Sequence, residues 1–335
     1  MLKRLSFLVL FLILIMFLTL PFTDLCFTRE LQLKPHRPIV IEEEENLTKP
    51  GTDHGCRCVT GGSGTDKDPY VIEGWDIKGS DFYGMYITGI SVPLVIKDVA
   101  VHHNGKDSRF SGIYMENVQN ITIEKTTVAN NKGAGIVLHE SSNSKLIENI
   151  VKDNKWIGIA LFQSNNNILS NNTVTGNSWG IRLEAAKNNT LSGNSVTNNV
   201  DIGMFLRGIG NVFIGNTIRS NGYDGINLDS SRNSVVIRNT ICNNKMGISL
   251  YSSKDIVIDS NTICDNKEGG VYFEFSRDNL LINNKIIQNK DSAIRKGAHS
   301  INNRLINNTI EDKVKDKTSS EEKIGTSKGF QSGQG

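Results

Sequence analysis

Apolar and polar residues alternate in short runs along the middle of the chain. Runs such as Ile136 to Leu138 and Val235 to Ile237 place an apolar side chain at every second position. A period of two is typical of β-strands, and these runs lack the spacing of three and four residues that marks an amphipathic helix. The pattern therefore predicts an all-β protein built from many short strands.

The phrase Gly-Ile-x-Leu, or a close variant, recurs with a period of 22 or 23 residues. Its copies start at Gly112, Gly135, Gly158, Gly180, Gly203, Gly225, Gly247, Gly270 and, in a degraded form, Ala293. A short fixed period indicates a solenoid, because one unit cannot bury its own apolar face and must stack on its neighbours. Three strands per unit, separated by polar corners, predict a single-stranded right-handed parallel β-helix. We expect about ten coils from Gly84 to Ala293, on the order of 50 Å in length.

Asparagine occupies columns of the same repeat. The phrase Asn-x-Ile/Val-x-x-Asn supplies the pairs Asn149/Asn154, Asn172/Asn177, Asn194/Asn199, Asn216/Asn221, Asn239/Asn244, Asn261/Asn266 and Asn284/Asn289. Stacked amides can hydrogen-bond from rung to rung at a spacing of about 4.8 Å, so we interpret these columns as structural. N-glycosylation motifs, which would make this a glycoprotein, stand at Asn46, Asn120, Asn171, Asn188 and Asn307. We expect most of them to be unoccupied ladder positions.

The chain outside the repeat divides into three further segments. Residues 1–22 combine Lys3 and Arg4 with a long apolar run, which predicts an export signal, either a cleaved signal peptide or a membrane anchor. Residues 23–60 predict an extended spacer, residues 61–311 the β-helix, with its first strand over residues 70–77, and residues 312–335 a disordered tail. Lys3 and Arg4 account for the net charge of +2. We therefore expect an exported, extracellular or cell-surface protein without a nucleic-acid partner, which contacts membrane only through its N-terminal segment.

Two groups of cysteines carry separate expectations. His54, Cys56 and Cys58 would project to one side of an extended segment, as a copper or zinc site requires. Alternatively, Cys56 or Cys58 belongs to a disulfide in an oxidising compartment. Cys242 and Cys264 occupy equivalent places in successive units, so we predict a disulfide between them.

The segment Gly62-Ser-Gly-Thr-Asp-Lys-Asp-Pro-Tyr-Val-Ile-Glu-Gly-Trp-Asp-Ile77 precedes the coils. Together with the coils it resembles exported, mostly archaeal, right-handed β-helix repeat proteins of the pectin-lyase-like fold. That group is similar to the periplasmic copper-related protein NosD and to carbohydrate-binding and sugar-hydrolysing β-helices. The resemblance covers residues 61 to about 311 and implies the fold, whereas the residues that carry it belong to the scaffold rather than to a site.

The x positions of Gly-Ile-x-Leu-x are expected to face solvent in two outward columns. The first column holds Tyr114, Val137, Ala160, Arg182, Phe205, Asn227, Ser249, Tyr272 and Arg295. The second holds Glu116, His139, Phe162, Glu184, Arg207, Asp229, Tyr251 and Glu274. Between them these columns predict a groove for an acidic or neutral polysaccharide.

Four residues are the candidate catalytic groups of this groove. Glu184 and Asp229 would act as acid and base or nucleophile, and Arg182 or Arg207 would bind carboxylates of the glycan. Two rungs, about 10 Å, separate the two carboxylates, which favours inverting hydrolysis. In a lyase an arginine would take the proton. The candidate substrate-binding residues are Glu116, His139, Phe162, Phe205, Asn227, Tyr251, Tyr272 and Glu274.

A corner loop, residues 105–111, is inserted next to this face and is expected to form a wall of the groove. An alternative interpretation is a solvated face on which Glu184 and Arg207 pair across rungs. Asp229 alone does not supply the stack of aspartates that a calcium-dependent lyase needs. His102 and His103 are adjacent on a strand and should diverge.

Three functions therefore stay open. The first is a non-catalytic rod that binds polysaccharide or a cell-surface glycan. The second is a carbohydrate-active enzyme, namely a polysaccharide hydrolase, lyase or epimerase. The third is a NosD-like copper-handling role that uses His54, Cys56 and Cys58. We expect no resident cofactor, with copper and calcium as the ions left open.

Overall fold

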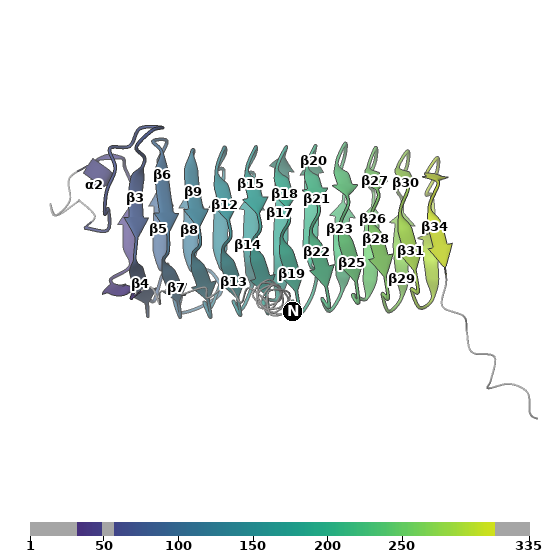
Figure 1. The fold of residues 1–335 in the computed structure, drawn as a ribbon, viewed down its shortest axis with the longest axis horizontal. Helices are drawn as coiled ribbons and strands as arrows, with labels where there is room; N and C mark the ends of the chain where they lie inside the picture. Colours follow the sequence, from purple (N-terminus) through teal and green to yellow (C-terminus); the bar gives the residue numbers. More distant parts are fainter. Residues whose placement is uncertain (1–31, 49–56, 312–335) are drawn as a thin grey trace, which may run out of the picture. The chain divides into compact units, whose positions relative to one another are not determined.

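A computed structural model describes residues 32–48 and 57–311, and within them the chain winds through three parallel sheets of 12, 11 and 11 strands (Figure 1). Sheet A consists of β1 (Lys34–His36), β4 (Trp75–Lys78), β7 (Ala100–His102), β10 (Thr127–Ala129), β13 (Ile150–Lys152), β16 (Thr173–Thr175), β19 (Ser195–Thr197), β22 (Thr217–Arg219), β25 (Thr240–Cys242), β28 (Thr262–Cys264), β31 (Lys285–Ile287) and β34 (Thr309–Glu311). Sheet B consists of β2 (Ile39–Ile41), β5 (Met85–Thr88), β8 (Ile113–Glu116), β11 (Ile136–His139), β14 (Ile157–Phe162), β17 (Trp179–Lys187), β20 (Met204–Ile209), β23 (Asp224–Asp229), β26 (Met246–Tyr251), β29 (Gly269–Glu274) and β32 (Ser292–Lys296). Sheet C consists of β3 (Tyr70–Glu73), β6 (Leu94–Lys97), β9 (Ile121–Glu124), β12 (Lys145–Ile147), β15 (Ile168–Ser170), β18 (Thr190–Ser192), β21 (Val212–Ile214), β24 (Val235–Ile237), β27 (Val257–Asp259), β30 (Leu280–Ile282) and β33 (Arg304–Ile306).

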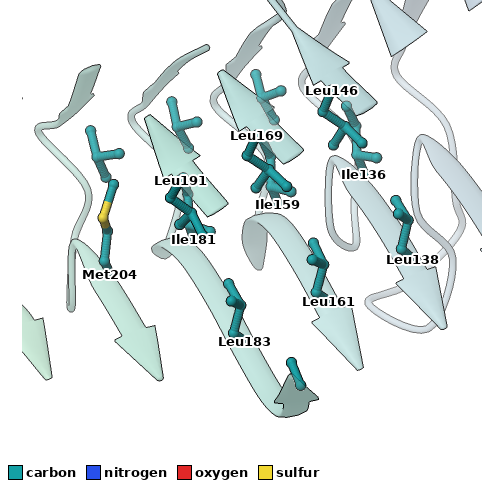
Figure 2. Packing of buried hydrophobic residues seen from close by; sticks show 14 of the residues in the cluster. Ile136, Leu138, Leu146, Ile159, Leu161, Leu169, Ile181, Leu183, Leu191 and Met204 are labelled. Atoms are coloured by element: carbon teal, nitrogen blue, oxygen red, sulfur yellow. The ribbon is translucent and has the colours of Figure 1, made fainter. Parts of the chain in front are cut away.

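Each Gly-Ile-x-Leu segment lies in sheet B directly beside the preceding one, as the repeat predicts. Ile136 pairs with Ile159, which pairs with Ile181, and Leu138 follows the same register to Leu161. Their side chains point into the solenoid, where they meet the leucines of sheet C (Figure 2). The all-β, three-strand coil is therefore confirmed, and its core is a continuous set of stacked apolar columns.

The solenoid has about eleven turns rather than ten, because it begins earlier than the repeat indicates. Strand β1 pairs with β4, and β2 pairs with β5, although both come from the predicted spacer, residues 23–60. That prediction is wrong for this part: Ile39 and Ile41 are buried in the core. The expected first strand, residues 70–77, is also wrong, because Gly74 turns the chain with a φ of +75° between β3 and β4.

The one-turn helix α2 (Glu45–Thr48) follows β2 and adds to the first turn. The side chain of Leu47 joins the hydrophobic core with only 2% of its surface exposed. Asn46 supports this turn because its side-chain oxygen accepts hydrogen bonds from the backbone N–H groups of Glu42 and Glu43, at 2.9 and 3.3 Å. The helix thus contributes an apolar side chain to the beginning of the stack.

The paired asparagines form the predicted internal ladders. The Asn172 amide donates to the Oδ1 of Asn194 at 2.9 Å and to the carbonyl of Leu146 at 2.8 Å, and Asn194 repeats this pattern toward Asn216. These side chains are buried and fully hydrogen-bonded, so the ladder is structural.

The N-glycosylation motifs do not coincide with the ladders, contrary to expectation. Asn120, Asn171, Asn188 and Asn307 are exposed corner residues with φ between 50° and 58°. Asparagine tolerates this left-handed conformation, which explains its use at these corners.

The structure contains the predicted disulfide between Cys242 of β25 and Cys264 of β28, with Cα atoms 4.6 Å apart. Cys58 is buried and also disulfide-bonded, which is one of the two alternatives for the His54, Cys56 and Cys58 group. His54 and Cys56 lie outside the described residues, as do the predicted export segment and tail. Among residues 32–48 and 57–311, no helix is long and apolar enough to span a bilayer.

Candidate functional site

The outward residues of sheet B line up in the two predicted columns. Tyr114 pairs with Val137, and Glu116 with His139, between β8 and β11. Further along the solenoid, Phe162 of β14 pairs with Glu184 of β17, and Glu184 pairs with Arg207 of β20. Residues far apart in the sequence therefore lie one rung apart on a single face.

The first column is not open to solvent along its whole length, contrary to expectation. Its members Val137, Ala160, Phe205, Asn227 and Ser249 are all buried. Several strands of sheet B begin one residue before the glycine, and one of these leading residues, Ile157, packs against Val137 and Ala160 of the first column. The result is a second, small apolar cluster of Ala134, Val137, Ile157 and Ala160, against which Tyr114, Phe162 and Trp179 pack.

Beside this cluster lies a groove of ≈ 470 Å³, called here the sheet B groove. Its walls and floor are formed by Arg109, Ser111, Tyr114, Val137, His139, Trp156, Phe162, Gln163, Glu184 and Ala185. These residues come from four adjacent turns, from β8 to β17, and from the corner loop of residues 105–111. The loop thus lies at the groove, as the insertion in the repeat predicted.

Aromatic contacts hold the corner loop against sheet B. The Phe110 ring packs edge-on against Phe82 and Tyr83, with centroids 5.1 and 5.3 Å apart. Tyr83 in turn lies 5.0 Å from Tyr114, a lining residue of the groove. Burial, with a further contribution from the Glu116 charge, raises the pKa of Tyr114 to about 12, so its hydroxyl stays protonated at neutral pH.

Two arginines and two carboxylates form an ion-pair chain beside the groove. The Arg182 guanidinium donates two hydrogen bonds to Glu184 Oε2, at 3.1 and 2.6 Å. Arg207 donates a hydrogen bond to Glu184 Oε1 at 3.2 Å and another to the Asp229 carboxylate. The hydrogen bond to Asp229 is the main cause of the raised pKa of Arg207. Glu184 and Asp229, predicted as an acid and base pair, are thus joined through one arginine.

Arg182 is also enclosed by aromatic rings. Its guanidinium carbon lies 5.0 Å from the Trp179 ring centre, 5.4 Å from Phe205 and 5.9 Å from Phe162. Such cation–π contacts add to its ion pair with Glu184 and restrict its rotamers. Phe205, predicted to bind substrate, is buried in this support and does not line the groove.

The predicted substrate-binding residues fall into two separate sets. His139 and Phe162 line the groove, and Glu116 accepts a hydrogen bond from His139 Nδ1 at 3.1 Å. The other four residues, Asn227, Tyr251, Tyr272 and Glu274, lie on β23, β26 and β29 and do not line it. The structure does not bring these two sets together.

Next to Asn227 of the C-terminal set lies a carboxyl group that the sequence analysis missed. Asp224 is 2% exposed, and its Oδ2 accepts a hydrogen bond of 2.6 Å from Asn227. Burial raises the pKa of Asp224 to about 6. The sequence did contain a sign of this group: Asp224 stands directly before a repeat glycine, where the neighbouring units have the apolar residues Ile202 and Met246.

Sequence reasoning also missed Trp156, Gln163 and Arg109 as lining residues. Trp156 lies two residues before a repeat glycine, outside both predicted columns, and 39% of its surface is exposed. An exposed tryptophan beside a repeat motif is a signal that could have identified it.

His102 and His103 converge instead of diverging. His103 has a φ of 57°, so the strand ends there, and its Nδ1 lies 2.8 Å from Nδ1 of His102. The other nitrogen of His102 lies 2.7 Å from Asp76. Even so, the described part of the chain contains no group of three or more His, Cys, Asp or Glu side chains arranged to hold a metal ion.

Comparisons with known proteins identify the same architecture. The chain superimposes on the mannuronan C-5 epimerase AlgE4 A-module of Azotobacter vinelandii with a TM-score of 0.57 and 15% identity, over 72% of this chain and 86% of that one. A variant of the periplasmic alginate epimerase AlgG gives 0.55 and 16%, over 81% and 83%. The Dettilon tailspike protein gives 0.51 and 14%, over 72% of this chain and 59% of that one.

At these identities the structural likenesses establish the fold alone. No curated protein matches the chain in sequence. The model of the right-handed β-helix region matches residues 51–196 and 179–310. The chain therefore belongs to the right-handed β-helix family.

Proposed function

We propose that this protein binds a polysaccharide in the sheet B groove. The observation that carries the proposal is the groove's lining: the aromatic rings of Tyr114, Trp156 and Phe162 lie among the polar groups of His139 and Gln163 over three adjacent turns. Apolar walls with a few placed polar groups are typical of ligand sites, and flat rings pack well against the C–H faces of sugars. A face that repeats at every rung suits a polymer.

The ion-pair chain favours binding over cleavage. A glycosidase needs one carboxyl group free to protonate the leaving oxygen and a second to activate water or attack. Here both Arg182 and Arg207 pair with Glu184, and Arg207 pairs with Asp229 as well. The copper-handling alternative has less support, because Cys58 is disulfide-bonded and so offers no thiolate.

Export is part of the proposal. The Cys242–Cys264 disulfide and the disulfide-bonded Cys58 are typical of an oxidising compartment. The AlgG relative in fold is described as periplasmic. We propose that the protein works outside the cytoplasm, where polysaccharides are accessible.

Tryptophan fluorescence gives a direct test, because of the three tryptophans Trp156 lines the groove and Trp179 packs against the apolar cluster beside it. Titration of the full chain with a panel of soluble polysaccharides should change this emission for at least one of them. Trp156→Ala and Phe162→Ala should weaken that binding about tenfold or more, equivalent to about 1.4 kcal/mol. Phe275→Ala removes an exposed aromatic residue that does not line the groove and should bind normally.

The same panel distinguishes the enzymatic alternative. We expect no shortening of any polysaccharide after long incubation. Shortening that Glu184→Gln or Asp229→Asn abolishes would replace the binding proposal with the catalytic one. Normal binding by both groove variants would place the site elsewhere.

A further inference from the structure

We infer that the polysaccharide held in the sheet B groove is uncharged. The inference rests on the proposed function and names the substrate class of that site. It starts from the ion pairs at the groove: its arginines and the carboxylates of Asp107, Glu184 and Asp229 are paired with one another.

Arg182 has the least freedom to bind an anion. Its two hydrogen bonds to Glu184 occupy one edge of the guanidinium, and three aromatic rings lie around it. A uronate carboxylate could bind Arg182 only by displacing Glu184, which would leave that carboxylate next to the incoming anion. Such an exchange gains little and adds a repulsion between like charges.

The two other arginines are engaged in the same way. Arg207 bridges Glu184 and Asp229. Arg109 makes a two-point contact with Asp107, at 3.0 and 2.7 Å, within the corner loop. Because the partner aspartate lies only two residues from Arg109, both charges of this pair belong to the same short loop.

The sum of charges within these ion-paired groups is close to zero. These groups contain three arginines, four carboxylates and one histidine. They are Arg109, Arg182, Arg207, Asp107, Glu116, Glu184, Asp229 and His139. The net charge of this set is therefore zero when the histidine is protonated and −1 when it is neutral. A polyuronate carries a negative charge on every sugar and would gain no net attraction from this set.

Paired charges are nevertheless good partners for hydroxyl groups. A carboxylate held by arginine keeps lone pairs that accept from sugar hydroxyls, and His139 and Gln163 offer both donors and acceptors. Hydrogen bonds from charged groups to neutral ligands are strong and do not depend on net charge. Stacking on Trp156 and Phe162 is likewise insensitive to the charge of the glycan.

This assignment separates the chain from two proteins that share its fold. They are described as a mannuronan and an alginate epimerase, and both polymers are polyuronates. Sharing the fold does not imply sharing a preference for polyuronates, because the outward side chains of sheet B determine which glycan fits.

Fluorescence titration with two polymer classes tests the inference. The neutral set is a β-glucan, a mannan and a xylan, and the acidic set is alginate and polygalacturonate, each at low and at high ionic strength. We expect the best neutral polymer to bind at least tenfold more tightly than either polyuronate, with an affinity that salt leaves unchanged.

A charge-removing variant provides a second, independent readout. Glu184→Gln combined with Asp229→Asn releases Arg182 and Arg207 and should create salt-sensitive binding to polyuronates, at least tenfold above wild type. Asp255→Asn combined with Asp278→Asn removes two exposed charges that do not line the groove and should create none. Thermal unfolding of both variants verifies that each is folded.

The outcomes separate the two proposals. Salt-sensitive binding of a polyuronate by the wild type that requires Trp156 would overturn the uncharged substrate and leave polysaccharide binding intact. A wild type that binds no polymer of either class would overturn both.

Discussion

A buried polar residue of this solenoid stabilises or destabilises its turn according to whether its polar atoms have hydrogen-bond or ionic partners. Asn194 is fully buried, yet its amide donates to Leu169 and Asn216, and its oxygen accepts from Asn172. Asp224 is also buried; Asn227 and Ser249 hydrogen-bond to it and Lys245 attracts its charge, but the effect of burial outweighs them. The first residue therefore stabilises its turn, whereas the second destabilises it once ionised.

Asp224→Asn should stabilise the protein at neutral pH. The folded-state pKa of about 6 exceeds the ordinary value of 3.8, so the folded state holds this proton more tightly than the unfolded state. The free energy of unfolding then falls as pH rises from about 4 to about 6, by on the order of 3 kcal/mol. The variant should lack this fall and match the wild type below about pH 4. Denaturant unfolding at a series of pH values measures the difference.

Asp255→Asn, at an exposed corner, is the matched control and should keep the pH dependence of the wild type. Parallel pH profiles for wild type and Asp224→Asn would show that Asp224 is not the group responsible.

Elements of the solenoid are held together by rung-to-rung contacts that leave little room. A Cβ atom added to Gly180 would lie 2.3 Å from the carbonyl oxygen of Gly203 in the next turn. This close approach explains why the phrase opens with glycine. Between β25 and β28 a covalent bond strengthens the same stacking, because Cys242 and Cys264 join two adjacent turns.

Replacing both cysteines by serine should lower the free energy of unfolding by about 3 kcal/mol, since the disulfide closes a loop with a sequence separation of 22. Denaturant unfolding under oxidising conditions measures this loss. The wild type in reductant is a less specific comparison, because it also loses the disulfide of Cys58. Equal stability of the double variant and the oxidised wild type would contradict a stabilising role.

At the scale of the whole solenoid, each turn pairs only with the turns before and after it. Stability is then approximately a sum of local terms, and a defect in one turn should affect its neighbours most. The sheet B groove belongs to the turns of β8 to β17, whereas the last turns carry no residue that lines it.

Leu281→Ala removes a fully buried side chain from β30 and should cost about 2 to 5 kcal/mol locally. Amide hydrogen exchange followed by mass spectrometry should then accelerate in the turns around β30 and remain unchanged in β8 to β14. Leu191→Ala, in β18 of the same turn as Glu184, should accelerate exchange in the turns around β18 and leave those around β30 unchanged. A uniform acceleration along the chain in either variant would indicate a single cooperative unit.

Much of this architecture could be predicted from the sequence. Because the same phrase returns every 22 or 23 residues, any stable stack must place Ile136 beside Ile159 and Cys242 beside Cys264. Strand type, register, ladder asparagines and the two columns of sheet B follow from that repetition alone. The first turn escaped prediction because β1 and β2 lack the phrase and are recognised only by the strands with which they pair.

The amino-acid sequence by itself determined the coil, since a repeated pattern specifies repeated neighbours. The tertiary structure decided how open each outward column is, which side chains enclose Arg182, and that one arginine joins Glu184 to Asp229. Those contacts involve residues from several turns and from a corner loop outside the repeat. Their geometry depends on three-dimensional packing, which no periodicity along the chain encodes.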